Sequence, residues 1–194
     1  MNFSESHLTR QRDGARIVLV EPSRSARAVL ARRLSEAGYR AIVAESAEQG
    51  VSELHRMPVD LVLAELTLPG MSGIELTRLI RDDSSLRDIP VILIAGRSDA
   101  AGAIRALEAG ADDIVAKPFF EEVLIARIAR QLARARGVRE LRADNATLDA
   151  RIVTRAIELG ELRIALRESE SERRRLAGLA QRDQYSGSPG YSHR

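Results

Sequence analysis

Between residues 16 and 136 the sequence alternates five short apolar runs with longer helix-like stretches. Each run is too short for a helix and is rich in β-branched residues, which is typical of buried strands. Strands that are apolar on both faces and are joined by helices indicate a parallel sheet covered by helices on both sides. The five runs are residues 17–20, 41–44, 59–64, 91–95 and 113–116.

The order of these elements narrows the fold class to one α/β architecture. Five successive βα units favour the flavodoxin-like doubly wound fold, whose five parallel strands lie in the order 2-1-3-4-5. Ser46, Ser72 and Ser98 stand at the expected starts of three helices, where a hydroxyl caps free backbone N–H groups. In such sheets, functional groups gather beyond the carboxyl ends of the strands. Here those ends carry Glu21, Glu65, Ala95 and Lys117.

Composition excludes several kinds of protein. There is no cysteine, so disulfides and thiolate metal sites are absent, and the three histidines have no ligand spacing. The formal net charge is only +2, and the arginines of residues 127–142 alternate with apolar positions, so we expect no direct DNA binding. No apolar run is long enough for a membrane span. We therefore expect a cytoplasmic protein with no metal site and no membrane contact.

After residue 136 the apolar residues return at spacings of three and four, in one a/d heptad register. This register predicts a long coiled-coil helix; a solvated single helix or a helix that folds back on itself is the alternative. Asn145 falls at an a position, where a buried Asn favours a parallel two-stranded coil. Polar residues also stand at Arg155, Ser169 and Arg173. The apolar seam positions are Val138, Leu141, Leu148, Ile152, Leu159, Leu162, Leu166 and Leu176.

These patterns divide the chain into four segments. We expect a flexible tail over residues 1–14 and the α/β domain over residues 15–136. The coiled-coil helix follows over residues 137–180, continuous with the last helix of that domain. A disordered tail takes up residues 181–194, where Ser, Gly, Pro and Tyr dominate.

Three segments resemble the receiver domains of two-component response regulators. Residues 60–73 resemble the phosphoacceptor region, and residues 110–119, which contain Lys117 and Pro118, resemble the segment of the conserved lysine. Residues 17–23 resemble the first strand and the acidic turn after it. The resemblance covers the α/β domain and implies the CheY-like fold and a role in phosphorelay signalling.

The sequence departs from the family pattern at the positions that carry the chemistry. Receivers of this type use an aspartate as phosphoacceptor, an acidic pair that holds Mg²⁺, a Ser or Thr that follows the phosphoryl group, and an aromatic switch residue. The matching residues here are Glu65, the pair Glu21 and Pro22, Ala95 and Ile114. Lys117, the only lysine in the chain, is the one position kept unchanged.

These departures predict a site that phosphorylates poorly. Mg²⁺ requires oxygen ligands in near-octahedral geometry, and Pro22 offers no side-chain ligand, so we expect no cofactor beyond weak Mg²⁺ binding. Glu65 is one methylene longer than Asp, and a displacement of about an ångström can cost roughly 10²-fold in rate. Two interpretations of Glu65 stay open: an ion pair with Lys117 that imitates an activated or fixed state, or a solvated strand end.

We therefore expect a protein that is not an enzyme and that signals by contact, a phosphorylation-independent pseudo-receiver. Its partners would be a second copy, through the parallel coiled coil, and another signalling protein or output domain. The alternative is a phosphorylatable receiver fragment that regulates a lost output domain, such as a diguanylate cyclase, PAS or histidine-kinase module. The helix resembles the signalling helices that link receivers to such modules.

Overall fold

The computed structural model describes residues 14–97 and 99–186, and the side chains of these residues except 153, 165 and 176–186. The predicted tail residues 1–13 and 187–194, and the predicted cap Ser98, lie outside the described residues. The chain divides into two compact units, Met1–Arg139 and Glu140–Arg194. The elements are β1 (Arg16–Val20), α2 (Arg24–Glu36), β2 (Arg40–Ala44), α3 (Ala47–Arg56), β3 (Leu61–Glu65), α4 (Gly73–Asp82), β4 (Val91–Ala95), α5 (Ala100–Glu108), β5 (Asp113–Ala116) and α6 (Glu121–Ser186).

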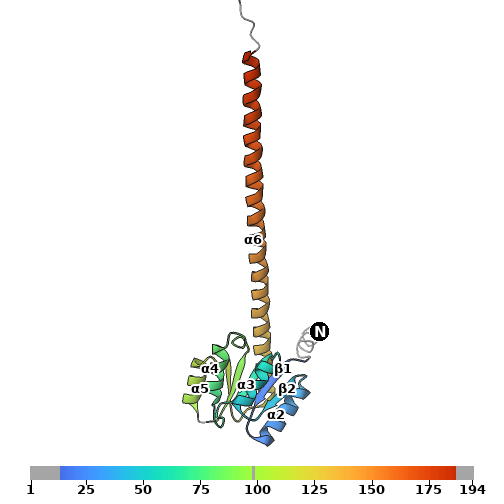
Figure 1. The fold of residues 1–194 in the computed structure, drawn as a ribbon. Coiled ribbons are helices and arrows are strands. Elements are labelled where there is room, and N and C mark those ends of the chain that lie inside the picture. Colours follow the sequence, from blue (N-terminus) through green and yellow to red (C-terminus); the bar gives the residue numbers. More distant parts are fainter. Residues whose placement is uncertain (1–13, 98, 187–194) are drawn as a thin grey trace, which may run out of the picture. The chain divides into compact units, whose positions relative to one another are not determined.

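The first unit contains a five-stranded parallel sheet in the order β2-β1-β3-β4-β5 (Figure 1). This order is the predicted doubly wound one, so the predicted fold class is confirmed. Because all strands are parallel, their carboxyl ends meet at one edge of the sheet. The strands lie within two residues of the five apolar runs of the sequence.

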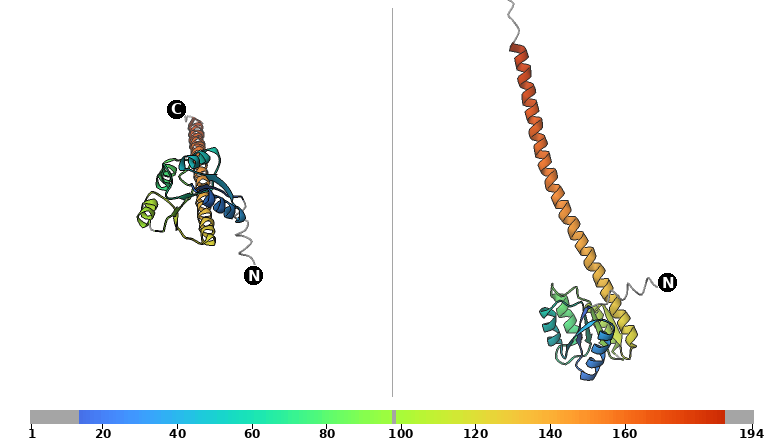
Figure 2. Two further views of the ribbon diagram at one scale, coloured as in Figure 1. Left: turned by 90° about the horizontal axis from the view of Figure 1, so that it is seen from below. Right: turned by 90° about the vertical axis from the view of Figure 1, so that its right-hand side faces the viewer.

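Two hydrophobic cores lie on opposite faces of the sheet, because successive strand residues point to opposite sides. Leu30 and Leu34 of α2 and Leu124 and Ile128 of α6 pack on one face, against residues such as Leu19. The other core joins strand residues to α3, α4 and α5. Its members include Val18, Leu54, Val62, Leu76, Leu93 and Ala106. Figure 2 shows helices on both sides of the sheet.

Three helices begin at N-capping residues that lie at or near the predicted positions. The Ser72 hydroxyl accepts a hydrogen bond from Glu75 N, and the Glu75 carboxylate accepts one from Ser72 N, which completes a capping box. The Ser46 hydroxyl accepts from the backbone N–H of Gln49 at the start of α3. Helix α5 is capped by the Asp99 carboxylate, which accepts from Gly102 N. The predicted cap Ser98 is therefore one residue early.

The second unit is the part of α6 that follows Arg139. The helix extends to Ser186, past the predicted end of the coil at residue 180. The predicted start of the tail is wrong here, because residues 181–184 include two glutamines and an arginine, which support a helix. Within the described residues, no helix is both long and apolar enough to cross a lipid bilayer.

Candidate functional site

Two acidic side chains and one basic side chain meet at the carboxyl edge of the sheet. Glu21 directly follows β1, Glu65 ends β3, and Lys117 follows β5. The backbone N–H of Lys117 donates to the carbonyl of Ala95 at 2.8 Å, which places the lysine beside the end of β4. The parallel topology thus brings together residues that lie far apart in the sequence.

Lys117 forms an ion pair with Glu65. Its Nζ lies 2.5 Å from Glu65 Oε2 and 3.7 Å from Glu21 Oε2. Both carboxylates are largely buried, with side-chain exposures of 11% for Glu65 and 4% for Glu21, whereas the lysine remains 41% exposed. Of the two interpretations of Glu65, the structure contains the ion pair and not the solvated strand end.

Glu21 is the more deeply enclosed of the two acids. Its Oε1 accepts a hydrogen bond from the backbone N–H of Ser23 at 2.9 Å. Its Oε2 is buried and has no hydrogen-bond partner among the described residues, and the ammonium of Lys117 stands 3.7 Å away. Since a buried carboxylate is costly without a compensating charge, Lys117 serves both acids.

Burial controls the protonation of Glu65. The loss of solvent raises the pKa of this carboxyl above its usual value of 4.5. The hydrogen bond and charge of Lys117 act in the opposite direction, and the nearby Glu21 carboxylate adds to the increase. The two acids and one lysine therefore form a coupled group in which Glu65 holds its proton more tightly than a free glutamate.

The turn after β1 is fixed by a residue that the sequence reasoning missed. Arg27 donates from one nitrogen to the carbonyls of Glu21 and Pro22, at 2.7 and 3.3 Å. Its other terminal nitrogen pairs with Glu45 at 2.6 Å. Its side chain is only 11% exposed. In the sequence, one arginine in an arginine-rich helix gives no signal of this role.

The residues at this edge do not fit a tightly bound Mg²⁺. Pro22 has no side-chain oxygen, so the acidic turn offers one carboxylate. The Lys117 ammonium already lies against both Glu65 and Glu21, and a cation next to them would meet its charge at close range. Among the described residues there is no group of three or more His, Cys, Asp or Glu side chains arranged for a metal ion.

The two switch positions carry no polar side chain. Ala95 ends β4 and is 2% exposed, and its methyl group cannot donate or accept a hydrogen bond. Ile114, in β5, is partly buried against the core that includes α5. The site therefore lacks both a hydroxyl to follow a phosphoryl group and an aromatic ring at the second position.

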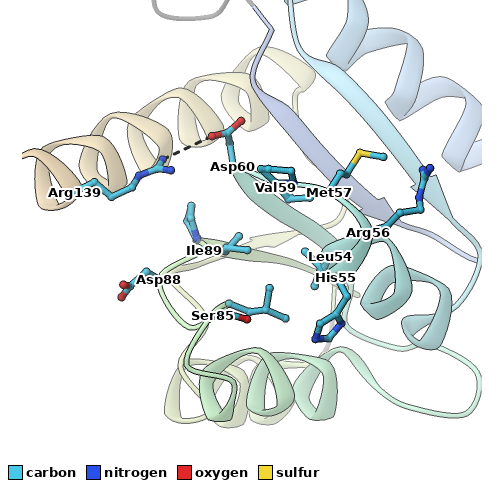
Figure 3. A pocket seen from close by; sticks show the side chains of 13 residues that line it. Leu54, His55, Arg56, Met57, Val59, Asp60, Ser85, Asp88, Ile89 and Arg139 are labelled. Atoms are coloured by element: carbon cyan, nitrogen blue, oxygen red, sulfur yellow. Dashed lines mark ion pairs between the residues drawn. The ribbon is translucent and has the colours of Figure 1, made fainter.

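A separate cavity of about 570 Å³ lies at the opposite edge, near the amino ends of β3 and β4 (Figure 3). Its wall is apolar around Leu54 and Ile89, and its rim carries charges of both signs, including Asp60 and Arg139. Arg139 lies 3.8 Å from Asp60, whose other oxygen accepts from Arg16 N at 2.9 Å. This mixed lining selects no ligand chemistry, so the candidate site remains at the carboxyl edge.

Comparisons with known proteins agree with this geometry. The phosphate regulon transcriptional regulatory protein PhoB of Escherichia coli is 35% identical over 119 residues, which make up 61% of this chain and 52% of that protein. The DNA-binding response regulator MtrA of Mycolicibacterium smegmatis is 34% identical over 119 residues, covering 61% of this chain and 51% of MtrA. The chain thus spans about half the length of the curated relatives it matches.

Solved structures and the family model point to the same domain. The signal receiver domain of a signal transduction histidine kinase from Syntrophus aciditrophicus is 34% identical with a TM-score of 0.58, covering 61% of this chain and 90% of that chain. The structure of FixJ-N is 31% identical with a TM-score of 0.57, and the match covers 61% of this chain and 94% of that chain. The family model of the response regulator receiver domain matches residues 17–129, more than half of the 194 residues. The chain belongs to the response regulator receiver domain family of two-component signalling proteins.

Proposed function

We propose that this chain is a phosphorylation-independent pseudo-receiver that signals by protein contact, as a homodimer joined through a parallel coiled coil. The observation that carries the proposal is the pairing of Lys117 Nζ with Glu65 Oε2 at 2.5 Å. In this proposal residues 15–136 form the receiver and residues 137–180 the coil. The site residues are the acceptor equivalent Glu65, the acidic-turn equivalents Glu21 and Pro22, the switch equivalents Ala95 and Ile114, and Lys117.

The charge balance at the edge supports a fixed state. The acceptor-equivalent Glu65 supplies a negative charge to Lys117 without any phosphoryl transfer. The pair links the end of β3 to the loop after β5 across 52 residues of sequence. Phosphoryl transfer depends on positioning and on neutralising developing charge, and neither a second acidic-turn ligand nor a hydroxyl at Ala95 is available for it.

The exposed seam of α6 supports the coiled coil. Leu141 and Ile152 are each 66% exposed, and Leu162 is 71% exposed. Large apolar side chains that form a stripe along an exposed helix favour a covering partner in water. A second copy in the same register would bury them and would place Asn145 against Asn145. Leu176 belongs to the predicted seam, but its side chain lies outside the described ones.

The test measures mass and phosphorylation together. Light scattering would determine the mass of the full chain with and without Mg²⁺ and beryllofluoride, and acetyl phosphate would serve as the phosphodonor. We expect a mass of at least a dimer that none of these additions changes, and no Mg²⁺-dependent labelling. A monomer that dimerises only with beryllofluoride would contradict the proposal. Glu65→Gln, which keeps the size and removes the charge, should then alter partner binding if the pair fixes the signalling state.

A second function is favoured by one observation, the length of the relatives. The matched proteins continue well beyond the receiver, and PhoB is named a transcriptional regulatory protein. A phosphorylatable receiver that regulates an output domain would need Mg²⁺ at the carboxyl edge. Mg²⁺-dependent labelling of Glu65 would favour this second function over the pseudo-receiver.

A further inference from the structure

Helix α6 carries a second apolar stripe, outside the a and d positions. Ile157 and Ile164 are 58% and 60% exposed, and both are f positions in the register that has Asn145 at a. The b and f positions between Arg139 and Arg167 are all uncharged, at alternating spacings of three and four. These residues, here named the outer stripe, are Ala143, Ala146, Ala150, Val153, Ile157, Gly160 and Ile164.

The outer stripe and the a/d seam lie on nearly opposite sides of the helix, because b and f are the heptad positions turned away from a and d. A dimer formed through the a/d seam therefore leaves the outer stripe uncovered. A helix that is apolar on two sides is typically buried on two sides. The outer stripe thus requires an occupant of its own, whatever covers the a/d seam.

We propose that the outer stripe binds the outer stripe of another copy of this chain, with the two helices antiparallel. In one register, each isoleucine of the stripe faces a smaller residue. Ile164 lies opposite Ala146, and Ile157 lies opposite Val153. Each isoleucine thus fills space beside a smaller partner, and Ala150 and Gly160, which face each other in the same register, let the two backbones approach closely. The inference goes beyond the proposed a/d dimer and does not depend on it.

The charges beside the outer stripe match the same register. In an antiparallel pair, equivalent flanking positions face each other, so e positions meet e positions. Arg142 then faces Glu170, and Asp149 faces Arg163, each twice because of the two-fold symmetry. Ala156 stands at the centre and meets its own copy. Both kinds of ion pair are attractive, in contrast to the a/d seam, where Asp144 faces Asp149.

The c positions flank the outer stripe on the side opposite the e positions, and they are compatible with close packing at the centre of the contact. They include Thr147 and Thr154, whose hydroxyls donate to backbone carbonyls one turn earlier in the helix, at 2.9 and 3.1 Å. These bonds leave no hydroxyl donor to be satisfied at the contact. In the antiparallel register Thr154 meets its own copy and Thr147 faces Glu161. Like charges, Glu140 and Glu168, meet only at the two ends, where water screens them.

A parallel pair through the same stripe would be poorer. Each residue would then face its own copy, so Gly160 would face Gly160 and Ile157 would face Ile157, which alternates gaps with crowding. Of the flanking residues within the length of the outer stripe, only Arg163 would meet an attractive partner, Glu168. The match of size and charge therefore favours the antiparallel arrangement.

Disulfide crosslinking in the full chain tests this contact, because the native sequence has no cysteine. Ala156→Cys should give a covalent dimer as the main product under mild oxidation. In a parallel a/d dimer the two Ala156 residues lie on opposite sides of the seam and do not crosslink. Ile152→Cys, at an a position, reports the a/d dimer separately. Arg151→Cys, a g position whose two copies do not face each other in either contact, measures random collision.

The outcomes separate the two contacts. Crosslinking at Ala156→Cys well above Arg151→Cys supports the inference, even if Ile152→Cys fails and the proposed a/d dimer is lost with it. Crosslinking at Ile152→Cys with Ala156→Cys at the collision level would overturn the inference and leave the a/d dimer intact. Crosslinking at Ile157→Cys in place of Ala156→Cys would show a parallel pair and would also overturn it.

A charge exchange provides the second measurement. Asp149→Arg places a second positive charge against Arg163 in the outer contact, but it places an opposite charge against Asp144 in the a/d seam. It should reduce the Ala156→Cys crosslink several-fold while the Ile152→Cys crosslink holds or increases. Adding Arg163→Asp in the same chain restores the attraction and should restore the Ala156→Cys product. An Ala156→Cys yield that ignores both changes would contradict the antiparallel register.

Discussion

Lys117 Nζ lies 2.5 Å from Glu65 Oε2, so the only lysine of the chain joins the end of β3 to the loop after β5. The same ammonium stands 3.7 Å from the buried Glu21. One partly exposed cation thus compensates two carboxylates that have lost most of their contact with water. The stability of both acids therefore depends on this one ammonium.

Removal of the ammonium should destabilise the receiver. Lys117→Met leaves Glu21 and Glu65 buried without a compensating charge, and we expect a loss of about 1–3 kcal/mol in the free energy of unfolding. Lys117→Arg keeps the positive charge and serves as the control. Urea unfolding measures both variants. An unchanged unfolding free energy in Lys117→Met would show that the two acids do not depend on the lysine.

The stability of the receiver should carry a pH dependence that Glu65 causes. Its folded pKa is raised above 4.5 by burial, so its contribution to stability is fully present below that pH and is lost as the pH rises through the raised value. Glu65→Gln cannot ionise. The free energy of unfolding of Glu65→Gln minus that of the wild type should therefore increase as the pH rises from below 4.5 to neutrality. A difference that stays constant over this range would contradict the raised pKa.

Replacing Gly73 at the start of α4 should destabilise the receiver. A Cβ at this position would lie 2.6 Å from the carbonyl oxygen of Glu65 and 3.0 Å from Leu66 Cα, and backbone cannot yield to it easily. We expect Gly73→Ala to cost about 1–3 kcal/mol. Gly137→Ala is the matched control, because its Cβ meets open space and alanine favours a helix by about 0.5–1 kcal/mol. Thermal unfolding that lowers both midpoints equally would refute the steric argument.

Restoring the family residues should restore phosphorylation. Glu65→Asp shortens the acceptor and withdraws it from Lys117, Pro22→Asp adds a carboxylate for Mg²⁺, and Ala95→Thr adds a hydroxyl. We expect Mg²⁺-dependent labelling by acetyl phosphate in the triple variant. Glu65→Asp alone is the control and should label weakly or not at all. Equal labelling of the wild type and the triple variant would mean that these positions do not limit the chemistry.

Asn145 should limit the stability of the coil. In the a/d seam it places two amides in an apolar interface, which fixes the parallel two-stranded state at a cost in stability. Asn145→Leu should raise the melting temperature of the helix, followed by circular dichroism, and loosen the preference for two strands, followed by light scattering. Asn145→Gln retains an amide and provides the comparison. A lower melting temperature for Asn145→Leu would argue against an a position at residue 145.

The sequence by itself determined the fold class and the residues at the functional edge. Short apolar runs separated by helices leave few solutions other than a parallel sheet, and that sheet brings the ends of β1, β3, β4 and β5 together. Glu21, Glu65, Ala95 and Lys117 could therefore be named in advance. Local caps such as Ser72 followed from the sequence because the capping box needs only neighbouring residues.

Only the tertiary structure decided what these residues do to one another. Glu65 and Lys117 are 52 residues apart, and their separation in space depends on how the strands and loops pack, which no local pattern encodes. The near-complete burial of Glu21 and the hold of Arg27 on the acidic turn arise in the same way. Burial sets the cost of a charge and distance sets its compensation, and both are properties of the folded chain.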